Sequence, residues 1–320
     1  MKPDLSRRKF VAQFAGGTMG TLAGSWNMVT AKAADSEMGS KGNKHPDQEP
    51  VIEWNAHIFS PDVAKYPIHP QATYQPDMSK YPADPLGAYL NRMKEEGIDL
   101  AVIVHPEPYG DDHSLILDCL KAEPDRLKGT SLFYPRDPDA PNKLERLVRA
   151  EPRMVATRFH AHRGKETYLD SFRDAGVRAL WKKATDLGVI IELHIGPDYA
   201  LQAKEAIKAF PGCKVLIDHL SEPHLGTGVE FANVLDLADL PDVYMKLSGL
   251  NHFATDAPYY ESAMPFTKRV IEAFGPEKTV WGSGSPKIVD IHMEGYSDDD
   301  IDRVKGGNLR RLLNWKFPLG

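Results

Sequence analysis

The amino-acid sequence predicts a single, distorted (β/α)8 barrel, the TIM-barrel class of α/β fold, over residues 51–320. Three observations predict it. Short β-branched apolar runs alternate eight times with amphipathic helical patterns, Gly or Pro ends several of those patterns, and the units together fill the length of one such barrel. A doubly wound open sheet is the alternative, but it would place a Gly-rich phosphate turn after the first strand, where this chain has Asn55-Ala56-His57.

The expected elements follow from the spacing of apolar residues, which is two in a half-buried strand and three to four in a helix. We expect strands at residues 51–57, 99–105, 128–134, 155–162, 189–195, 214–220, 243–250 and 278–283. We expect helices at residues 86–96, 114–123, 143–150, 170–187, 199–210, 229–239, 259–274 and 298–313.

The connection after the first strand is unusually long. Residues 60–85 contain six prolines and three tyrosines. In a barrel this connection lies at the carboxyl ends of the strands, where substrates bind. We therefore expect a stiff aromatic loop over the mouth of the barrel, and a surface loop without a role is the alternative.

The first 33 residues have the features of a bacterial export signal, and residues 34–50 those of a polar linker. Ser6-Arg7-Arg8-Lys9-Phe10 resembles the twin-arginine type, a Gly-rich apolar stretch follows, and Ala31-Lys32-Ala33 provides a cleavage site. A short basic amphipathic helix is the alternative. The signal predicts contact with the export machinery and a periplasmic location.

Composition narrows the classes of function. A formal net charge of -6 and a sequence pI near 6.1 provide no basic surface for nucleic acid. The sequence holds no apolar run long enough for a stable membrane span, and two cysteines 94 positions apart form no Cys-rich zinc or disulfide framework. A small-molecule substrate is therefore expected.

Histidines gather at the predicted strand ends, where the active site of a barrel is built. We predict a catalytic role for His57, His160, His194 and His219. The side chains predicted to contact substrate are Asn55, His105, Tyr109, Arg158 and His252. The histidines in predicted loops or the linker, which are expected to be solvated, are His45, His69, His113, His224 and His292.

Strand alternation predicts which side chains share a face. Arg158, His160 and His162 alternate on strand four, Glu192 and His194 on strand five, and Glu53, Asn55 and His57 on strand one. An Arg158 guanidinium suits a substrate carboxylate, and an ion pair with Glu192 or Asp218 is the alternative.

Several of these segments together resemble the amidohydrolase-related family of barrel hydrolases, especially its lactonase and decarboxylase branches. The resemblance covers residues 51–315. Glu53-Trp54-Asn55-Ala56-His57 stands where similar proteins have Asp-x-His-x-His, and Glu192-Leu193-His194 resembles their Gln-Leu-His. The other matching segments are Gly97–Val102, Pro124–Gly129, Ile217–Leu220, Val243–Gly249, Trp281–Pro286 and Gly306–Leu312.

The chain departs from this family at two chemically important positions. Asn55 replaces the first histidine of the pair, and Gly284 replaces the aspartate of strand eight. The resemblance implies a divalent metal, zinc by preference, which His57, His194 and His219 could still hold; a metal-free protein is the alternative.

The sequence therefore leaves three alternative functions. The first is a lactonase-like hydrolase that acts on a small carboxylated or cyclic substrate, with a carbonyl polarised by His57 or His194 and a water activated by His160 or His219. The alternatives are a decarboxylase or other lyase on the same scaffold, and a non-catalytic periplasmic binding barrel that has lost the aspartate of strand eight.

Overall fold

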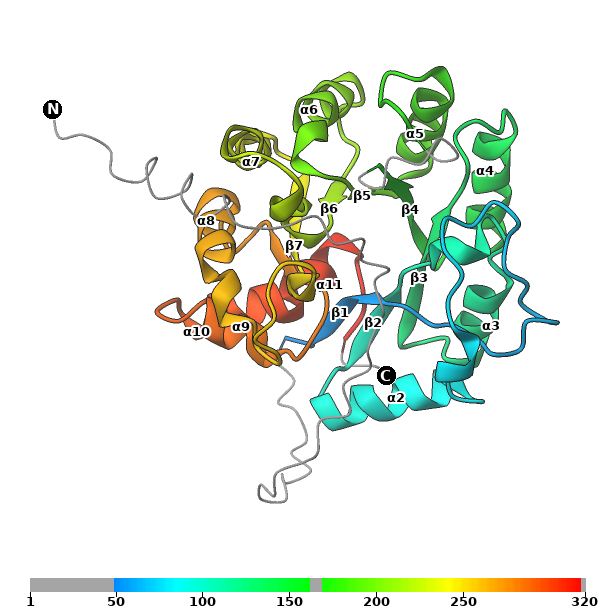
Figure 1. Cartoon of the computed structure of the whole chain (residues 1–320), viewed down its shortest axis with the longest axis horizontal. Helices are drawn as coiled ribbons and strands as arrows, with labels where there is room; N and C mark the ends of the chain where they lie inside the picture. The colour runs from blue at the N-terminus through cyan, green and yellow to red at the C-terminus, as the bar shows by residue number, and fades with distance from the viewer. Residues whose placement is uncertain (1–48, 162–168, 318–320) are drawn as a thin grey trace, which may run out of the picture. The chain divides into compact units, whose positions relative to one another are not determined.

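The computed structural model describes residues 49–161 and 169–317. Within them eight parallel strands, each paired with the next in the sequence, form a nearly closed barrel in which β1 and β8 are in contact (Figure 1). The predicted barrel is confirmed. The strands are β1 Ile52–Ala56, β2 Leu100–Ile103, β3 Leu127–Leu132, β4 Met154–His160, β5 Ile190–His194, β6 Val215–Ile217, β7 Val243–Leu247 and β8 Thr279–Trp281.

Helices surround the strands on the outside of the barrel (Figure 1). Their ends have ordinary chemistry: Asp84 accepts a hydrogen bond from the backbone of Gly87 at 2.9 Å, and Gly97 ends the same helix with φ of 70°. The helices are α2 Pro85–Glu96, α3 Ser114–Ala122, α4 Ala140–Ala150, α5 Ala175–Leu187, α6 Ala200–Ala209, α7 Gly228–Leu235, α8 Met264–Phe274, α9 Lys287–His292, α10 Asp298–Asp302 and α11 Asn308–Leu312.

The predicted elements differ from the structure mainly near the C-terminus. The helix expected at residues 298–313 is divided into α10, a π-helical turn at Arg303–Gly307, and α11, while α9 was not expected. The strand expected at residues 214–220 ends at Ile217, because the backbone turns into a left-handed conformation two residues later.

The barrel interior is apolar at the amino ends of its strands. Ile52, Leu100 and Ile190 belong to one buried cluster with Leu309 and Trp315, which come from α11 and the residues after it. The C-terminal segment therefore closes the end of the barrel opposite the mouth. A second, larger buried cluster joins the outer faces of the strands to the helices.

Polarity changes along each strand from that apolar floor toward the mouth. On β4 the inward positions are Ala156, Arg158 and His160, and the register of the sheet aligns the last two with Glu192 and His194 of β5. An ionic layer therefore lies above the apolar floor, and a histidine layer lies above the ionic one. The inward direction expected for these alternating residues is observed.

The face predicted for strand one is wrong at its first residue. Ile52 and Trp54 point into the barrel, while Glu53 points outward and accepts hydrogen bonds from Tyr89 at 2.7 Å and Arg92 at 3.0 Å. A register irregularity between Trp54 and Ala56 shifts the alternation, so Glu53 does not share the face of His57.

The long loop after β1 packs beside the carboxyl ends of β2 and β3. Tyr81 stacks on Phe59 with ring centroids 4.8 Å apart, and the backbone of His69 donates to Pro108 at 2.8 Å. The hydroxyl of Tyr134, after β3, lies 3.0 Å from Nδ1 of His69. The loop is thus packed against the segments that follow β2 and β3.

Some predicted features lie outside the described residues: the export signal at residues 1–33, linker residues 34–48, His45 and His162. The last part of the predicted linker is described, and Glu49 forms ion pairs with Arg310 at 2.6 Å and Arg311 at 3.1 Å. In the described part of the chain, every helix is too short or too polar to span a bilayer.

Candidate active site

Four fully buried charged side chains form the ionic layer beneath the mouth. Arg158 donates to Oδ2 of Asp218 through Nε at 2.9 Å and Nη2 at 2.6 Å. Lys246 forms an ion pair with Oδ1 of Asp218 at 2.6 Å and donates a hydrogen bond to Glu192. All four have 2% exposure or less. Buried charges are costly unless they are paired, so these two cations and two carboxylates depend on one another.

The two carboxyl groups of this layer differ in their proton affinity. Burial, reinforced by the charge of Asp218, raises the pKa of Glu192 to about 7. Burial would also raise the pKa of Asp218, but Lys246 and Arg158 together outweigh it and hold that pKa well below its ordinary value. Asp218 is therefore the permanent anion of the layer.

A row of imidazole rings lies above the ionic layer. Ring centroids are 4.5 Å apart for His160 and His194, 4.7 Å for His194 and His219, and 4.9 Å for His219 and His252. These rings come from β4, β5 and the segments after β6 and β7. Four of the histidines that the sequence predicted at the mouth are thus brought together.

Glu222 joins two rings of this row. Its Oε1 accepts a hydrogen bond from Nε2 of His194 at 2.9 Å, and its carboxylate accepts from Nδ1 of His252 at 2.8 and 3.0 Å. Nδ1 of His224 lies 3.7 Å from Oε2. Glu222 is 1% exposed, so a buried carboxylate sits at the centre of the histidine row.

A left-handed turn after β6 carries two of these side chains. His219, Leu220, Ser221 and Glu222 have φ values of 54°, 55°, 59° and 49°. Each L-residue in this conformation costs roughly 1–2 kcal/mol, so four in succession are maintained only by their surroundings. The turn places His219 and Glu222 on the same side, facing His194.

The ring of His219 is tightly held. Its Nδ1 lies 2.7 Å from Oγ of Ser248, and a Cβ at Gly249 would stand 2.6 Å from the ring. Gly249 therefore gives the ring its space, with φ of 64° that also favours glycine. Burial lowers the pKa of His219 well below its ordinary value, so this ring is neutral at physiological pH.

His57 also lies near the ionic layer but makes a different contact. Its Nδ1 donates to the carbonyl of Val104 at 3.0 Å. Burial, with the nearby charges of Arg158 and Lys246, lowers its pKa to about 3. His57 is therefore a neutral ring at physiological pH.

Three residues predicted to contact substrate have structural partners. Nε2 of His105 lies 2.8 Å from the carbonyl of Gly110, and the hydroxyl of Tyr109 accepts from the backbone of Ser60 at 2.9 Å. His105 and Tyr109 are 1% and 2% exposed. Arg158 forms an ion pair with Asp218, which is the alternative that the sequence analysis gave for this residue. In the structure these three side chains are buried and engaged with the partners named above.

Asn55 and Gly284, the two departures from the family pattern, do not provide the histidine and the aspartate that would bind a metal. Asn55 Oδ1 is buried and has no hydrogen-bond partner among the described residues. Gly284 has φ of 84°, and its carbonyl accepts a hydrogen bond from Arg92 at 3.1 Å.

The metal ligands predicted from sequence are only partly brought together. Among the described residues, one set of at least three His, Cys, Asp or Glu side chains has donor atoms within 4.8 Å of one another: His194, His219 and Glu222. His57 is not in this set, because its ring is turned toward Val104.

Sequence reasoning missed Glu222, Lys246 and Ser248. Lys246 and Ser248 are two residues apart in strand seven and therefore share a face. A lysine within such an apolar run could have indicated a buried charge. Glu222 follows strand six in a polar segment, and only the left-handed turn turns it inward.

Two of the histidines expected to be solvated are buried instead. Nε2 of His113 accepts from the backbone of Leu132 at 3.1 Å, and Nδ1 of His292 lies 2.8 Å from the hydroxyl of Thr267. Both rings are at most 6% exposed. Each lies in a loop or short helix packed against the barrel, so loop position alone did not predict exposure.

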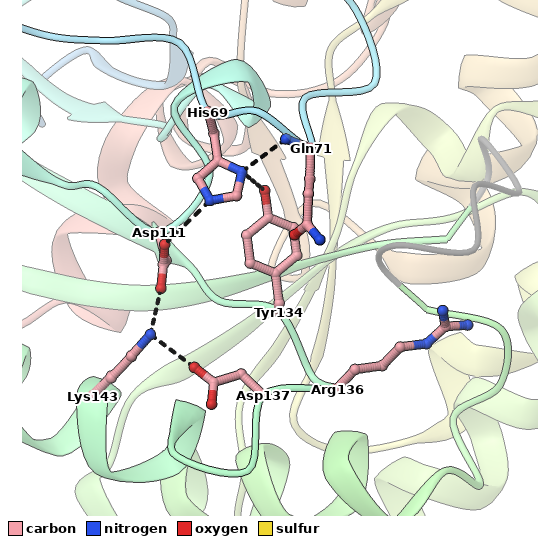
Figure 2. Close-up of a pocket in the computed structure, with 7 residues that line it drawn as sticks. All are labelled: His69, Gln71, Asp111, Tyr134, Arg136, Asp137 and Lys143. Atoms are coloured by element: carbon pink, nitrogen blue, oxygen red, sulfur yellow. Dashed lines mark hydrogen bonds and ion pairs between the residues drawn. The ribbon is translucent and has the colours of Figure 1, made fainter.

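A separate open pocket lies beside the long loop (Figure 2). Its charged groups are largely paired with one another: Lys143 contacts Asp111 and Asp137, each at 2.7 Å, and Nε2 of His69 lies 4.0 Å from Asp111. The row of histidines comes from β4 to β7, whereas this pocket is built by the long loop and the segments after β2 and β3. We therefore place the chemistry at the histidine row.

The protein is a (β/α)8 barrel with buried histidines and carboxylates at the carboxyl ends of its strands, which is where enzymes of this fold have their active sites. The sequence pattern of the amidohydrolase family matches residues 52–314. The chain belongs to the amidohydrolase family, as the resemblance of its motifs implied, and is a hydrolase.

Individual relatives are more distant. A 4-sulfomuconolactone hydrolase from Hydrogenophaga intermedia is 26% identical over 270 residues, which cover 82% of each chain. One of the same name from Rhizobium radiobacter is 29% identical over 201 residues, 62% of this chain and 64% of the relative.

Solved structures have the same fold. That of a putative 2-pyrone-4,6-dicarboxylic acid hydrolase from Pseudomonas putida is 23% identical, with a TM-score of 0.67 over 83% of this chain and 98% of its own. That of a 5-carboxyvanillate decarboxylase from Sphingomonas paucimobilis is 16% identical, with a TM-score of 0.56 over 84% and 99%. At these identities the likeness shows the fold alone.

Proposed function

We propose that this protein hydrolyses a small lactone, a cyclic ester, to the open hydroxy acid. The amidohydrolase family and the two relatives named as lactone hydrolases support this class of substrate. A carboxylate or other acidic group on the ring is the substituent we expect.

One observation carries the proposal: the Glu222 carboxylate accepts a hydrogen bond from Nδ1 of His252 at the mouth. This contact fixes the ring tautomer in which Nδ1 bears the proton and Nε2 bears the lone pair. The His252 side chain is 18% exposed, more than His194 or Glu222, so it can meet a bound substrate. A carboxylate that orients a histidine is a recurrent general-base arrangement.

The reaction needs one water and no other reactant. His252 Nε2 takes a proton as the water oxygen bonds to the lactone carbonyl carbon, and Glu222 stabilises the imidazolium that forms. The bond between the acyl carbon and the ring oxygen then breaks. The proton on His252 passes to that ring oxygen, and a hydroxy acid is released.

The family resemblance implies a divalent metal, but the strand-one and strand-eight positions do not fit one. Asn55 provides only a neutral amide oxygen, and Gly284 provides no side chain. No step of the proposed reaction passes through a metal at those positions.

Decarboxylation on the same scaffold is the second candidate, since a decarboxylase has this fold. The test is a panel of five- and six-membered lactones, with and without an acidic substituent, incubated with purified protein in ¹⁸O-enriched water. We expect acid release with one solvent oxygen in the new carboxylate. Carbon dioxide release without solvent oxygen in the product would establish the lyase, and inertness to the whole panel would favour a binding protein.

We also propose that the chain is exported to the periplasm, on the evidence of the paired arginines and the cleavage pattern. Replacing Arg7 and Arg8 with Lys should then retain the protein in the cytoplasm. A mature form still found in the periplasm would remove the twin-arginine assignment.

A further inference from the structure

We propose that the pocket beside the long loop binds a small neutral ligand with adjacent hydroxyl groups, the vicinal diol of a sugar or other polyol (Figure 2). The pocket has a volume of about 440 Å³, within the range of roughly 300–1,000 Å³ that small-molecule sites occupy. It is separate from the histidine row, so this inference goes beyond the proposed lactone hydrolysis. Binding in the pocket can be measured without any turnover.

The contacts of His69 carry the inference. Its Nδ1 accepts a hydrogen bond from the backbone of Gln71 at 3.2 Å and lies 3.0 Å from the hydroxyl of Tyr134. The ring proton is therefore on Nε2, which lies 4.0 Å from Oδ1 of Asp111. That distance is too long for a direct hydrogen bond. A single hydroxyl oxygen bridges such a gap when it accepts from Nε2 and donates to the carboxylate.

The same alternation of donor and acceptor continues along the pocket. Lys143 Nζ pairs with Oδ2 of Asp111 and with Oδ2 of Asp137, each at 2.7 Å. The result is a donor–acceptor row that consists of His69, Asp111, Lys143 and Asp137 (Figure 2). Because a hydroxyl group both donates and accepts, two adjacent hydroxyls can each accept from one member of this row and donate to the next.

The charges of the pocket favour a neutral ligand. Lys143 is already paired with two carboxylates, and its hydrogen bonds with Asp111 and Asp137 raise its pKa, so the ammonium group keeps its charge. Arg136, which also lines the pocket, pairs with Asp170. An anionic ligand would compete with the carboxylates for these cations, and a cationic ligand would compete with Lys143 for its carboxylates. A hydroxyl group leaves both kinds of pair intact.

The pocket is formed before any ligand binds. The backbone of His69 donates to the carbonyl of Pro108 at 2.8 Å. A Cβ at Gly110 would stand 2.6 Å from the His69 ring and 2.8 Å from the hydroxyl of Tyr134, so the absence of a side chain allows both groups to approach. The side chains of His69 and Asp111 are 26% and 24% exposed, which leaves them accessible to a ligand. Little ordering is then required on binding.

The test is saturation-transfer difference NMR of the full-length protein with erythritol, D-xylose and D-glucose, each titrated separately. The comparators are diethylene glycol, whose hydroxyls are not adjacent, and citrate, which is an anion. We expect at least one of the polyols to bind with a dissociation constant on the order of 1 mM or below. Neither comparator should bind.

Two variants remove members of the donor–acceptor row. Asp111→Asn should weaken polyol binding by roughly 10-fold or more, because a hydrogen bond to a charged group is lost, and His69→Phe by roughly 3-fold or more. Asp186→Asn is the matched control, since Asp186 pairs with Lys182 at 2.7 Å on helix α5. This control and His252→Asn, in the histidine row, should bind the polyol as the parent does.

Circular dichroism of each variant identifies any that fails to fold, and the other variant of the row then decides. The inference is overturned if no polyol binds, which would leave a bridging water as the occupant of the gap beside His69. It is equally overturned if a comparator binds as well as the polyols, or if a folded Asp111→Asn protein keeps the parent affinity. Loss of binding in His252→Asn would place the polyol at the histidine row and would also overturn it.

Discussion

Lys246 Nζ forms an ion pair with Oδ1 of Asp218 at 2.6 Å and donates a hydrogen bond to Glu192, and so joins two buried carboxylates on neighbouring strands of the barrel. Arg158 contacts the other oxygen of Asp218, Oδ2, at 2.6 Å. The histidine row lies directly above this layer, and Nη2 of Arg158 is 3.1 Å from Nδ1 of His194, so the position of the rings depends on the charge balance beneath them.

The first prediction concerns that balance. Lys246→Met should lower the free energy of unfolding by roughly 3–5 kcal/mol, because it leaves a buried carboxylate without its partner. Adding Glu192→Gln should recover much of the loss, since Arg158 and Asp218 then pair alone. Urea denaturation of the parent, both single variants and the double variant measures the coupling.

A matched control separates burial from charge. Lys182 pairs with Asp186 at 2.7 Å, but both side chains are more than half exposed. Lys182→Met should change stability by less than about 1 kcal/mol. An effect of Lys246→Met as mild as that of this control would show that the buried charges do not depend on one another.

The second prediction is a pH dependence of stability. Burial lowers the pKa of His105 to about 4, against an ordinary value of 6.5. Between these values the unfolded chain binds the proton and the folded chain does not, so stability falls as pH decreases from 6.5 toward 4. The slope from this residue is at most about 1.4 kcal/mol per pH unit.

His105→Gln should flatten that slope, and the free energy of unfolding measured at half-unit pH intervals is the readout. The slope due to His57, whose pKa is about 3, should remain. An unchanged profile in the variant would show that His105 is not the buried neutral ring described above.

The third prediction concerns Gly284. An aspartate there would restore the residue that the family has on strand eight, but φ of 84° disfavours any L-residue. Gly284→Asp should cost roughly 1–2 kcal/mol and add no zinc site, alone or with Asn55→His. Thermal melts and zinc titration measure both effects.

Gly97 provides the comparison for that variant, because it has φ of 70°. Among the described residues, no atom beyond its own helix and chain neighbours lies within 4 Å of the place that a Cβ would take. Within the described part of the chain, a Cβ at Gly284 would meet the side chain of Ile288, whose terminal methyl can rotate away. Gly97→Asp should therefore cost a similar amount. A gain of zinc affinity in Gly284→Asp without loss of stability would contradict the prediction.

Much of the fold and part of the site could be predicted from the sequence. The alternation on β4 and β5 correctly placed Arg158, His160 and His194, because both strands keep a regular register. The same rule placed Glu53 wrongly, because an irregularity in β1 changes the period and leaves no trace in the residue types.

The rest depended on backbone conformation that residue types do not encode. Four successive left-handed residues carry Glu222 into the histidine row, and none of them is glycine. The sequence predicted a strand through residue 220, which correctly placed His219 near the other histidines of the mouth. It did not predict that Glu222 lies among them. The charge partner of Arg158 was anticipated as an alternative, whereas Lys246 was not.

The central claim is that Glu222 and His252 act as one general-base unit in lactone hydrolysis. Kinetics of Glu222→Gln, His252→Asn and the double variant on the best lactone of the panel test it most directly. We predict that His252→Asn lowers kcat by roughly 10²- to 10⁴-fold, and that the double variant is little worse than the more impaired single variant, because residues that act as a unit are not additive. Full activity in His252→Asn, or losses that multiply in the double variant, would contradict the claim.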